Sequence, residues 1–191
     1  MDTSQRILDV AERLVQTRGY NGFSYADISE ELGITKASLH YHFASKADLG
    51  TTLIGRYSVT FSGALDSIDA AETDAREKLH RYVDLYEQVL RRDRMCLCGM
   101  LASDYNTLPK PMREGVRQFF DLNERWLGQV FTEGRRQRVL KFAGPPLEAG
   151  RLLLGSLEGA MLVARSYGSP ARFSAAARSM LAAVCLARKH G

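Results

Sequence analysis

Hydrophobic side chains recur at intervals of three and four residues along most of the chain. The first such stripe precedes Gly19 and consists of Ile7, Leu8, Ala11, Leu14 and Val15. Another stripe runs from Leu79 to Tyr86, and a longer one runs from Met112 to Phe131. This spacing matches the turn of an α-helix and predicts amphipathic helices that each bury one face.

Capping residues, glycines and prolines divide this pattern into about nine helices. Ser24 and Ser45 each precede an Asp by three residues, a typical start of a helix, and Gly33 separates two short helices. Each of the five prolines lies near an expected helix start. After a first helix that ends at Gly19, the expected helices are 24–31, 35–42, 45–68, 75–91, 95–106, 111–136, 146–167 and 170–188.

The composition agrees with an all-α fold. Leu and Ala together number 45, whereas Val and Ile together number 15, so residues that favour helices dominate. No segment has the apolar length of a membrane helix, the N-terminus does not resemble a signal peptide, and three cysteines suggest reduced thiols. We therefore expect a cytoplasmic protein that does not associate with a membrane.

The stretch ITKASLHYHFASKADL, residues 34–49, places His40 and His42 two positions apart. On a helix such side chains point about 200° apart, so they cannot bind one ion together, and no further ligand stands at suitable spacing. The stretch also lacks a nucleophile or acid that would support catalysis. We expect no metal, no cofactor and no enzymatic activity.

The two short helices around Gly33 have the arrangement of a helix-turn-helix. If Leu39 and Phe43 are buried, the second helix presents hydroxyl, imidazole and ammonium groups that can bind phosphates or base edges. The predicted DNA-binding residues are Ser24, Tyr25, Thr35, Lys36, Ala37, Ser38, His40, Tyr41, His42 and Lys46. Lys46 is expected to contact a phosphate from the first turn of the following helix. The alternative is a solvated polar face without a partner.

Net charge gives this prediction little support. The chain carries a net charge of +4, but residues 1–47 carry −1 and the remainder +5. DNA binding by the N-terminal segment therefore depends on where its basic groups lie.

The segment GFSYADISEELGITKASLHYHFASKADL, residues 22–49, resembles the N-terminal domain of the TetR family of transcriptional regulators. The positions that match the family pattern are Gly22, Phe23, Ser24, Ile28, Gly33, Ile34, Lys36, Leu39, Tyr41, Phe43, Lys46 and Leu49. The sequence departs from the pattern at Ser29, where Ala is usual, and at His40, where Tyr is common. Because His40 is expected to face outward, the presence of His in place of Tyr is expected to alter the DNA sequence preference and not the fold.

The resemblance implies a helix-turn-helix DNA-binding domain of three helices, residues 1–47. A larger helical domain for ligand binding and dimerisation, residues 48–191, would follow it. It also implies a homodimeric repressor that binds a palindromic double-stranded DNA operator and is released by a small-molecule or electrophile inducer. The alternative within the same family is a DNA-binding protein that a protein partner controls without a ligand.

Aromatic residues of the second domain are candidates to line a ligand pocket, although such stripes are more often plain core. The candidates are Tyr57, Phe61, Tyr82, Tyr86, Tyr105, Phe119, Trp126 and Met161. In the last two helices, Gly155 and Gly159 stand four apart, which allows close approach of another helix. These helices are expected either to form a dimer interface or to pack within one subunit.

Two cysteines lie in the sequence RRDRMCLCGML. With Asp93 as the N-cap, Cys96 would stand in the first turn of a helix beside several arginines, where a thiolate is stabilised. Cys96 and Cys98 are therefore candidate redox sensors, in a region that faintly resembles electrophile-sensing TetR repressors. The alternative is a pair of buried structural thiols. Cys185 is expected to be the least reactive of the three thiols, packed in the last helix.

Overall fold

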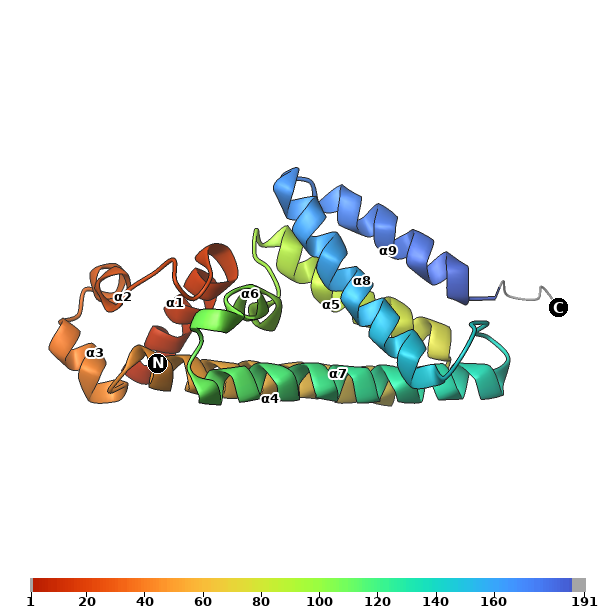
Figure 1. Cartoon of the computed structure of the whole chain (residues 1–191), viewed down its shortest axis with the longest axis horizontal. Coiled ribbons are helices and arrows are strands. Elements are labelled where there is room, and N and C mark those ends of the chain that lie inside the picture. The colour runs from red at the N-terminus through yellow and green to blue at the C-terminus, as the bar shows by residue number, and fades with distance from the viewer. Residues whose placement is uncertain (1, 187–191) are drawn as a thin grey trace. The chain divides into compact units, whose positions relative to one another are not determined.

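The computed structural model describes residues 2–186 and confirms the all-α fold (Figure 1). Within these residues the chain forms nine α-helices and one short 3-10 helix, η1, and its one β-type pairing is an isolated bridge between Leu140 and Cys185. The helices are α1 Thr3–Arg18, α2 Tyr25–Leu32, α3 Lys36–His42, α4 Lys46–Ala71, α5 Ala75–Arg91, α6 Leu97–Ser103, η1 Tyr105–Thr107, α7 Lys110–Gln137, α8 Pro146–Ser166 and α9 Pro170–Val184.

The chain divides into two compact units. Unit 1 comprises Met1–Thr60 and Arg94–Phe119, and unit 2 comprises Phe61–Asp93 and Phe120–Gly191. Helices α4 and α7 each contribute residues to both units. Unit 1 contains the whole predicted DNA-binding segment, and it also includes α6 and η1. The functional boundary after residue 47 remains a prediction.

The helix-turn-helix of unit 1 forms because its local signals agree with its core. Ser24 caps α2 in a capping box with Asp27, Gly33 adopts a left-handed conformation with φ of 65°, and the Thr35 side chain caps α3. The apolar faces of these helices and of neighbouring α1 and α4 then meet in one core. Its most deeply buried members include Ile7, Leu14, Ile28, Leu39, Leu49 and Leu53.

Unit 2 is built around the packing of α5, α8 and α9. Figure 1 shows α8 and α9 side by side, joined by a short turn, and both helices contact α5. Its core includes Leu79, Tyr82, Phe131, Leu157, Met161 and Phe173, all at most 1% exposed. No helix among residues 2–186 combines the length and apolar character needed to cross a membrane.

Two predicted helix boundaries were wrong. The expected helix 95–106 is α6 followed by η1, and its N-cap is Cys96 instead of Asp93. Asp93, with a φ of 56°, lies in the turn that ends α5, where its amide donates to Leu90 O at 2.9 Å. The amide of Met95 donates to Gln16 O at 3.1 Å, and α6 begins only after Cys96. Helix α9 ends at Val184, because Cys185 leaves the helix to form the bridge. The remaining predicted residues, 187 and 188, lie outside the described part of the chain.

Candidate nucleic-acid interface

Helix α3 presents one polar face to solvent. Leu39 is fully buried, whereas Tyr41 is 87% exposed. The other exposed residues of this face are Thr35, Lys36, Ala37 and His40, and Ser38 is half-buried. Small side chains at positions 37 and 38 leave room for close approach by a bulky partner. The structure therefore places the core of the predicted DNA-binding set on one accessible surface.

The imidazole of His40 has a defined orientation. Its Nδ1 lies 3.1 Å from Ala44 O, where the Nδ1–H tautomer forms a hydrogen bond. The His40 ring also packs against the ring of Tyr25, with centroids 4.9 Å apart. In this neutral tautomer Nε2 is an acceptor, suited to an amino group on a base edge. His42 is half-buried, and its ring meets Tyr41 edge-on at 5.4 Å.

Ser24 and Tyr25 stabilise the surroundings of α3. The Ser24 hydroxyl donates to Asp27 Oδ2 at 2.7 Å and accepts from the Ala26 amide. The Tyr25 hydroxyl donates to Phe43 O at 3.0 Å, just beyond the end of α3. Burial, with smaller effects from Asp48 and Tyr20, raises the pKa of Tyr25 to about 12, so its hydroxyl remains a donor. Both side chains therefore have structural partners in addition to their predicted role at DNA.

Lys46 is held within the protein. Its Nζ donates to Tyr20 O at 2.5 Å and also to Phe23 O. It lies over both aromatic rings, 4.6 Å from the Tyr20 centroid and 4.1 Å from that of Phe23. Burial lowers the pKa of Lys46, against smaller opposing effects of Asp27 and Asp104. This ammonium group fastens the loop before α2 to the start of α4, a role that the sequence pattern did not reveal.

Asp104 is a second residue that the sequence pattern missed. Its Oδ2 accepts from the Tyr20 amide at 2.7 Å, in the same loop whose carbonyl groups bind Lys46. Gly19, with φ of 78°, permits this approach, since a Cβ there would lie 2.8 Å from Asp104 Oδ2. Asn21 Nδ2 also donates to Thr107 Oγ1 at 2.8 Å. These bonds join the end of α6 and η1 to the helix-turn-helix, within unit 1.

Four of the predicted pocket residues form an aromatic cluster in unit 2. Tyr82 stacks on Trp126 with centroids 5.4 Å apart, and Phe61 meets the rings of Tyr82 and Tyr86 edge-on at 6.2 Å. The Tyr82 hydroxyl donates to Oδ1 of the fully buried Asn123 at 2.7 Å and lies 3.1 Å from that of Tyr86. Asn123 was not among the predicted pocket residues, although it lies on the same helical stripe.

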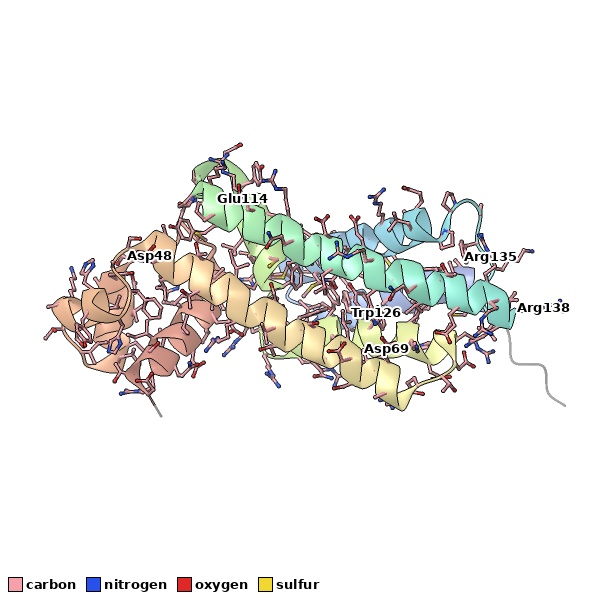
Figure 2. All side chains as sticks on the ribbon, turned by 90° about the horizontal axis from the view of Figure 1, so that it is seen from below. Asp48, Asp69, Glu114, Trp126, Arg135 and Arg138 are labelled. Carbon is pink, nitrogen blue, oxygen red and sulfur yellow. The ribbon has the colours of Figure 1, made fainter. Side chains whose placement is uncertain are left out.

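Charged groups border this cluster. Trp126 Nε1 donates to Asp69 Oδ2 at 2.9 Å, and Figure 2 shows the two labelled side chains close together. Lys78 is 9% exposed, and its Nζ lies 2.8 Å from Asp69 Oδ1 and 3.2 Å from Glu133 Oε2. Burial by itself lowers the pKa of Lys78, but hydrogen bonds to the two carboxylates outweigh it, and the pKa is raised. The cluster therefore combines stacked rings with a satisfied polar edge.

The other predicted pocket residues lie elsewhere. Tyr57 and Phe119 pack together in unit 1, with centroids 5.5 Å apart. Tyr105, in η1, is 38% exposed, and the Arg113 guanidinium lies 5.4 Å from its ring centroid. Met161 is fully buried in α8. Their role in a common pocket remains a prediction.

The exposure of the cysteines agrees with the alternative of buried structural thiols for Cys96 and Cys98, and it corrects the expectation for Cys185. Cys96 is 2% exposed and Cys98 fully buried, whereas Cys185 is half-buried and the most accessible of the three. The Cys96 Sγ accepts from the Gly99 amide at 3.4 Å, which places it at the start of α6 as an N-cap. Burial raises the pKa of Cys185. Among residues 2–186, no group of three or more His, Cys, Asp or Glu side chains is arranged to hold a metal ion.

Comparisons with known proteins agree with this geometry. Residues 7–50 match the family model for bacterial regulatory proteins of the tetR family. A TetR family transcriptional regulator of known structure from Agrobacterium tumefaciens is 34% identical, with a TM-score of 0.93 over 96% of this chain and 97% of that one. The chain belongs to the TetR family. It is a DNA-binding transcriptional regulator of the helix-turn-helix class.

Other TetR relatives match over similar lengths. The structure of a TetR transcriptional regulator from Legionella pneumophila is 31% identical, with a TM-score of 0.85 over 96% of this chain and 98% of that one. The HTH-type transcriptional repressor NemR of Escherichia coli K12 is 26% identical over 86% of this chain and 84% of its own length. The likeness therefore extends well beyond the helix-turn-helix.

Proposed function

We propose that this TetR regulator is a homodimeric repressor that places helix α3 of each protomer in the major groove of a palindromic operator. The observation that carries the proposal is the exposed face of α3, with Lys36, His40 and Tyr41 around the small residues Ala37 and Ser38. The repressor role is supported by the relationship to NemR, a transcriptional repressor.

The groups on this face suit two kinds of DNA contact. The Lys36 ammonium and the Thr35 hydroxyl are suited to phosphates, which position a protein on the duplex. His40 Nε2 and the Tyr41 hydroxyl are suited to base edges, which carry sequence information. Lys46 enters the proposal as a positioning residue, because its ammonium group already binds two carbonyl oxygens.

Dimerisation is supported by an exposed stripe on α8. Leu152, Leu162 and Val163 are 73%, 55% and 53% exposed, and nothing lies within 4 Å of a Cβ built on Gly155 or Gly159. Exposed apolar side chains of this kind mark a surface that binds another protein. In the alternative, a protein partner that controls the regulator would bind the same stripe. The oligomeric state of the purified protein distinguishes the two, since only the homodimer forms without another protein.

Release from DNA is proposed to follow binding of a small molecule or reaction with an electrophile. A ligand with a flat or apolar part is proposed to bind beside the aromatic cluster around Tyr82, whose rings pack on one another. The position of Cys96 supports release by an electrophile. Cys96 caps the start of α6, and Asp104 at the other end of α6 accepts a hydrogen bond from Tyr20, in the loop before α2. A buried Cys96 would react only when α6 opens locally, so Cys185 is expected to be alkylated first.

The electrophile arm has its own test. Alkylation of each thiol by N-ethylmaleimide is followed by mass spectrometry, together with release of bound DNA. Release is expected to follow modification of Cys96 and not that of Cys185. If a Cys96→Ser protein still released DNA on treatment, Cys96 would be excluded as the site at which an electrophile acts.

Selection of bound sequences from a random DNA pool tests the operator. The expected product is an inverted repeat whose half-sites lie about one helical turn, roughly 34–36 Å, or a multiple of it, apart. Enrichment of no sequence at low salt would contradict the proposal.

A further inference from the structure

The outward surface of α8 and α9 contains a groove at one end and an exposed aromatic side chain at the other. The groove has a volume of about 470 Å³ and lies in unit 2 between α8, α9 and the loop before α8. Tyr167, which is 63% exposed, lies at the opposite end of α8. Between them runs the stripe of Leu152, Gly155, Gly159 and Leu162.

The groove is preformed. Its floor includes Phe131, whose ring meets Phe142 edge-on at 4.9 Å, and the Arg135 guanidinium covers Phe142 at 4.1 Å from its centroid. Its wall is tied to the end of α9, because the Lys141 amide donates to Val184 O at 2.8 Å and the Leu186 amide to Val139 O at 2.9 Å. An apolar occupant therefore needs little rearrangement of the protein.

The exposed tyrosine is also held in place. The Arg172 guanidinium lies 3.7 Å from the centroid of the Tyr167 ring. This contact restrains the ring at the surface, so less rotational freedom is lost when the ring becomes buried. A large exposed aromatic side chain that is already oriented is typical of an anchor in a protein interface.

The two glycines indicate where another helix comes closest. A Cβ at Gly155 or Gly159 would meet nothing within 4 Å of its own chain, so neither glycine is required for packing inside the protomer. A two-fold axis between them, with antiparallel α8 helices, brings Leu152 opposite Leu162 of a second copy. It also brings Tyr167 of that copy level with Leu147 and Glu148, at the edge of the groove.

We infer that Tyr167 of each protomer inserts into the groove of a second copy and so fixes the geometry of the dimer. A parallel arrangement of the two α8 helices would place groove against groove and bring like charges at Arg172 together. In the antiparallel arrangement Arg172 approaches Glu148, which accepts from Arg151 at 2.7 Å and has capacity for another donor. This inference rests on the homodimer of the proposed function and adds the residues that specify it.

The experiment measures the dimer dissociation constant of the full chain by sedimentation, without DNA. Tyr167→Ala is expected to raise the constant at least about ten-fold, and Tyr167→Phe to leave it within about three-fold. Ala183→Trp, which fills the groove, should match Tyr167→Ala. Tyr41→Ala removes a tyrosine from α3 that is even more exposed, 87% against 63% for Tyr167, and it should leave the dissociation constant unchanged.

Gly159→Leu is a variant whose new side chain causes no clash inside the protomer, because nothing lies within 4 Å of a Cβ at Gly159. It should improve helix propensity and thermal stability of the protomer while weakening the dimer. Dimers as tight as wild type in Tyr167→Ala and Ala183→Trp would overturn the inference, and so would a wild-type chain that is monomeric. Because no DNA is present, failure to select an operator would count against the proposed function alone, whereas a monomeric wild-type chain would count against both proposals.

Discussion

Helix α3 and the cluster around Tyr82 both gather polar and aromatic side chains, but they use them in opposite ways. On α3 such groups face solvent around one buried leucine. In unit 2, by contrast, Tyr82 donates to Asn123 and stacks on Trp126, which donates to the Asp69 carboxylate. The comparison indicates that α3 is built to meet an external partner, and that the cluster contributes to the stability of its unit. Substitutions in the two regions should therefore affect different measurements.

The largest effect is expected inside unit 2. Tyr82→Ala should lower the free energy of unfolding by about 3–5 kcal/mol, because it creates a cavity beside Trp126 and removes the hydrogen bond from the Tyr82 hydroxyl to Asn123. Urea denaturation measures this change. Tyr82→Phe, which removes only the hydroxyl, should cost about 1–2 kcal/mol. Equal costs for the two variants would show that ring packing contributes little here.

Substitutions on α3 should weaken DNA binding and leave the stability of the protein nearly unchanged. His40→Ala and Tyr41→Ala should each weaken operator binding by about 1–3 kcal/mol, because each removes a base contact. Their free energies of unfolding should change by less than about 0.5 kcal/mol, as expected for exposed positions. Binding titrations and urea denaturation on the same preparations provide the comparison. Intact affinity in both variants would show that this face does not meet the DNA.

The two lysines of this region sharpen the contrast. Lys36→Ala should reduce the slope of log affinity against log salt by about 0.9, the effect of one lost phosphate contact. Lys46→Met should leave that slope unchanged and lower the free energy of unfolding by about 1.5 kcal/mol, since two carbonyl groups lose a charged donor. A reduced salt slope for Lys46→Met would show that Lys46 contacts a phosphate, as the sequence predicted.

The smallest effect concerns acid stability at the start of α2. Hydrogen bonds, first from the Ser24 side chain, lower the pKa of Asp27 below its ordinary value of 3.8. The folded state therefore favours the carboxylate, and this stabilisation is present above the unfolded pKa and lost as pH falls through the lower folded pKa. Between about pH 5 and about pH 3, the free energy of unfolding should fall less for Asp27→Asn than for wild type. The same pH dependence in both proteins would exclude this role.

The helix-turn-helix could be predicted because its determinants are local. The cap at Ser24, the left-handed Gly33 and the cap at Thr35 each act within a few residues, and one buried position, Leu39, decides which face of α3 points outward. A period of three to four residues contains this information directly.

Contacts between distant residues could not be predicted in this way. The amino group of Lys46 binds a loop more than 20 residues earlier, and Asp104 reaches Tyr20 across 84 residues. Cys96 was expected in the first turn of a helix, but it is the N-cap that precedes α6, and its thiol is buried. Periodicity reports which face of a helix is apolar, and it does not report which partner covers that face.

The most direct test of DNA reading by α3 compares sequences selected from one random pool by wild type and by His40→Ala. The expected result is relaxed preference at one position in each half-site, at the same place on both sides of the repeat, with all other positions unchanged. Identical base preferences for the two proteins would contradict the assignment of the exposed α3 face to base recognition.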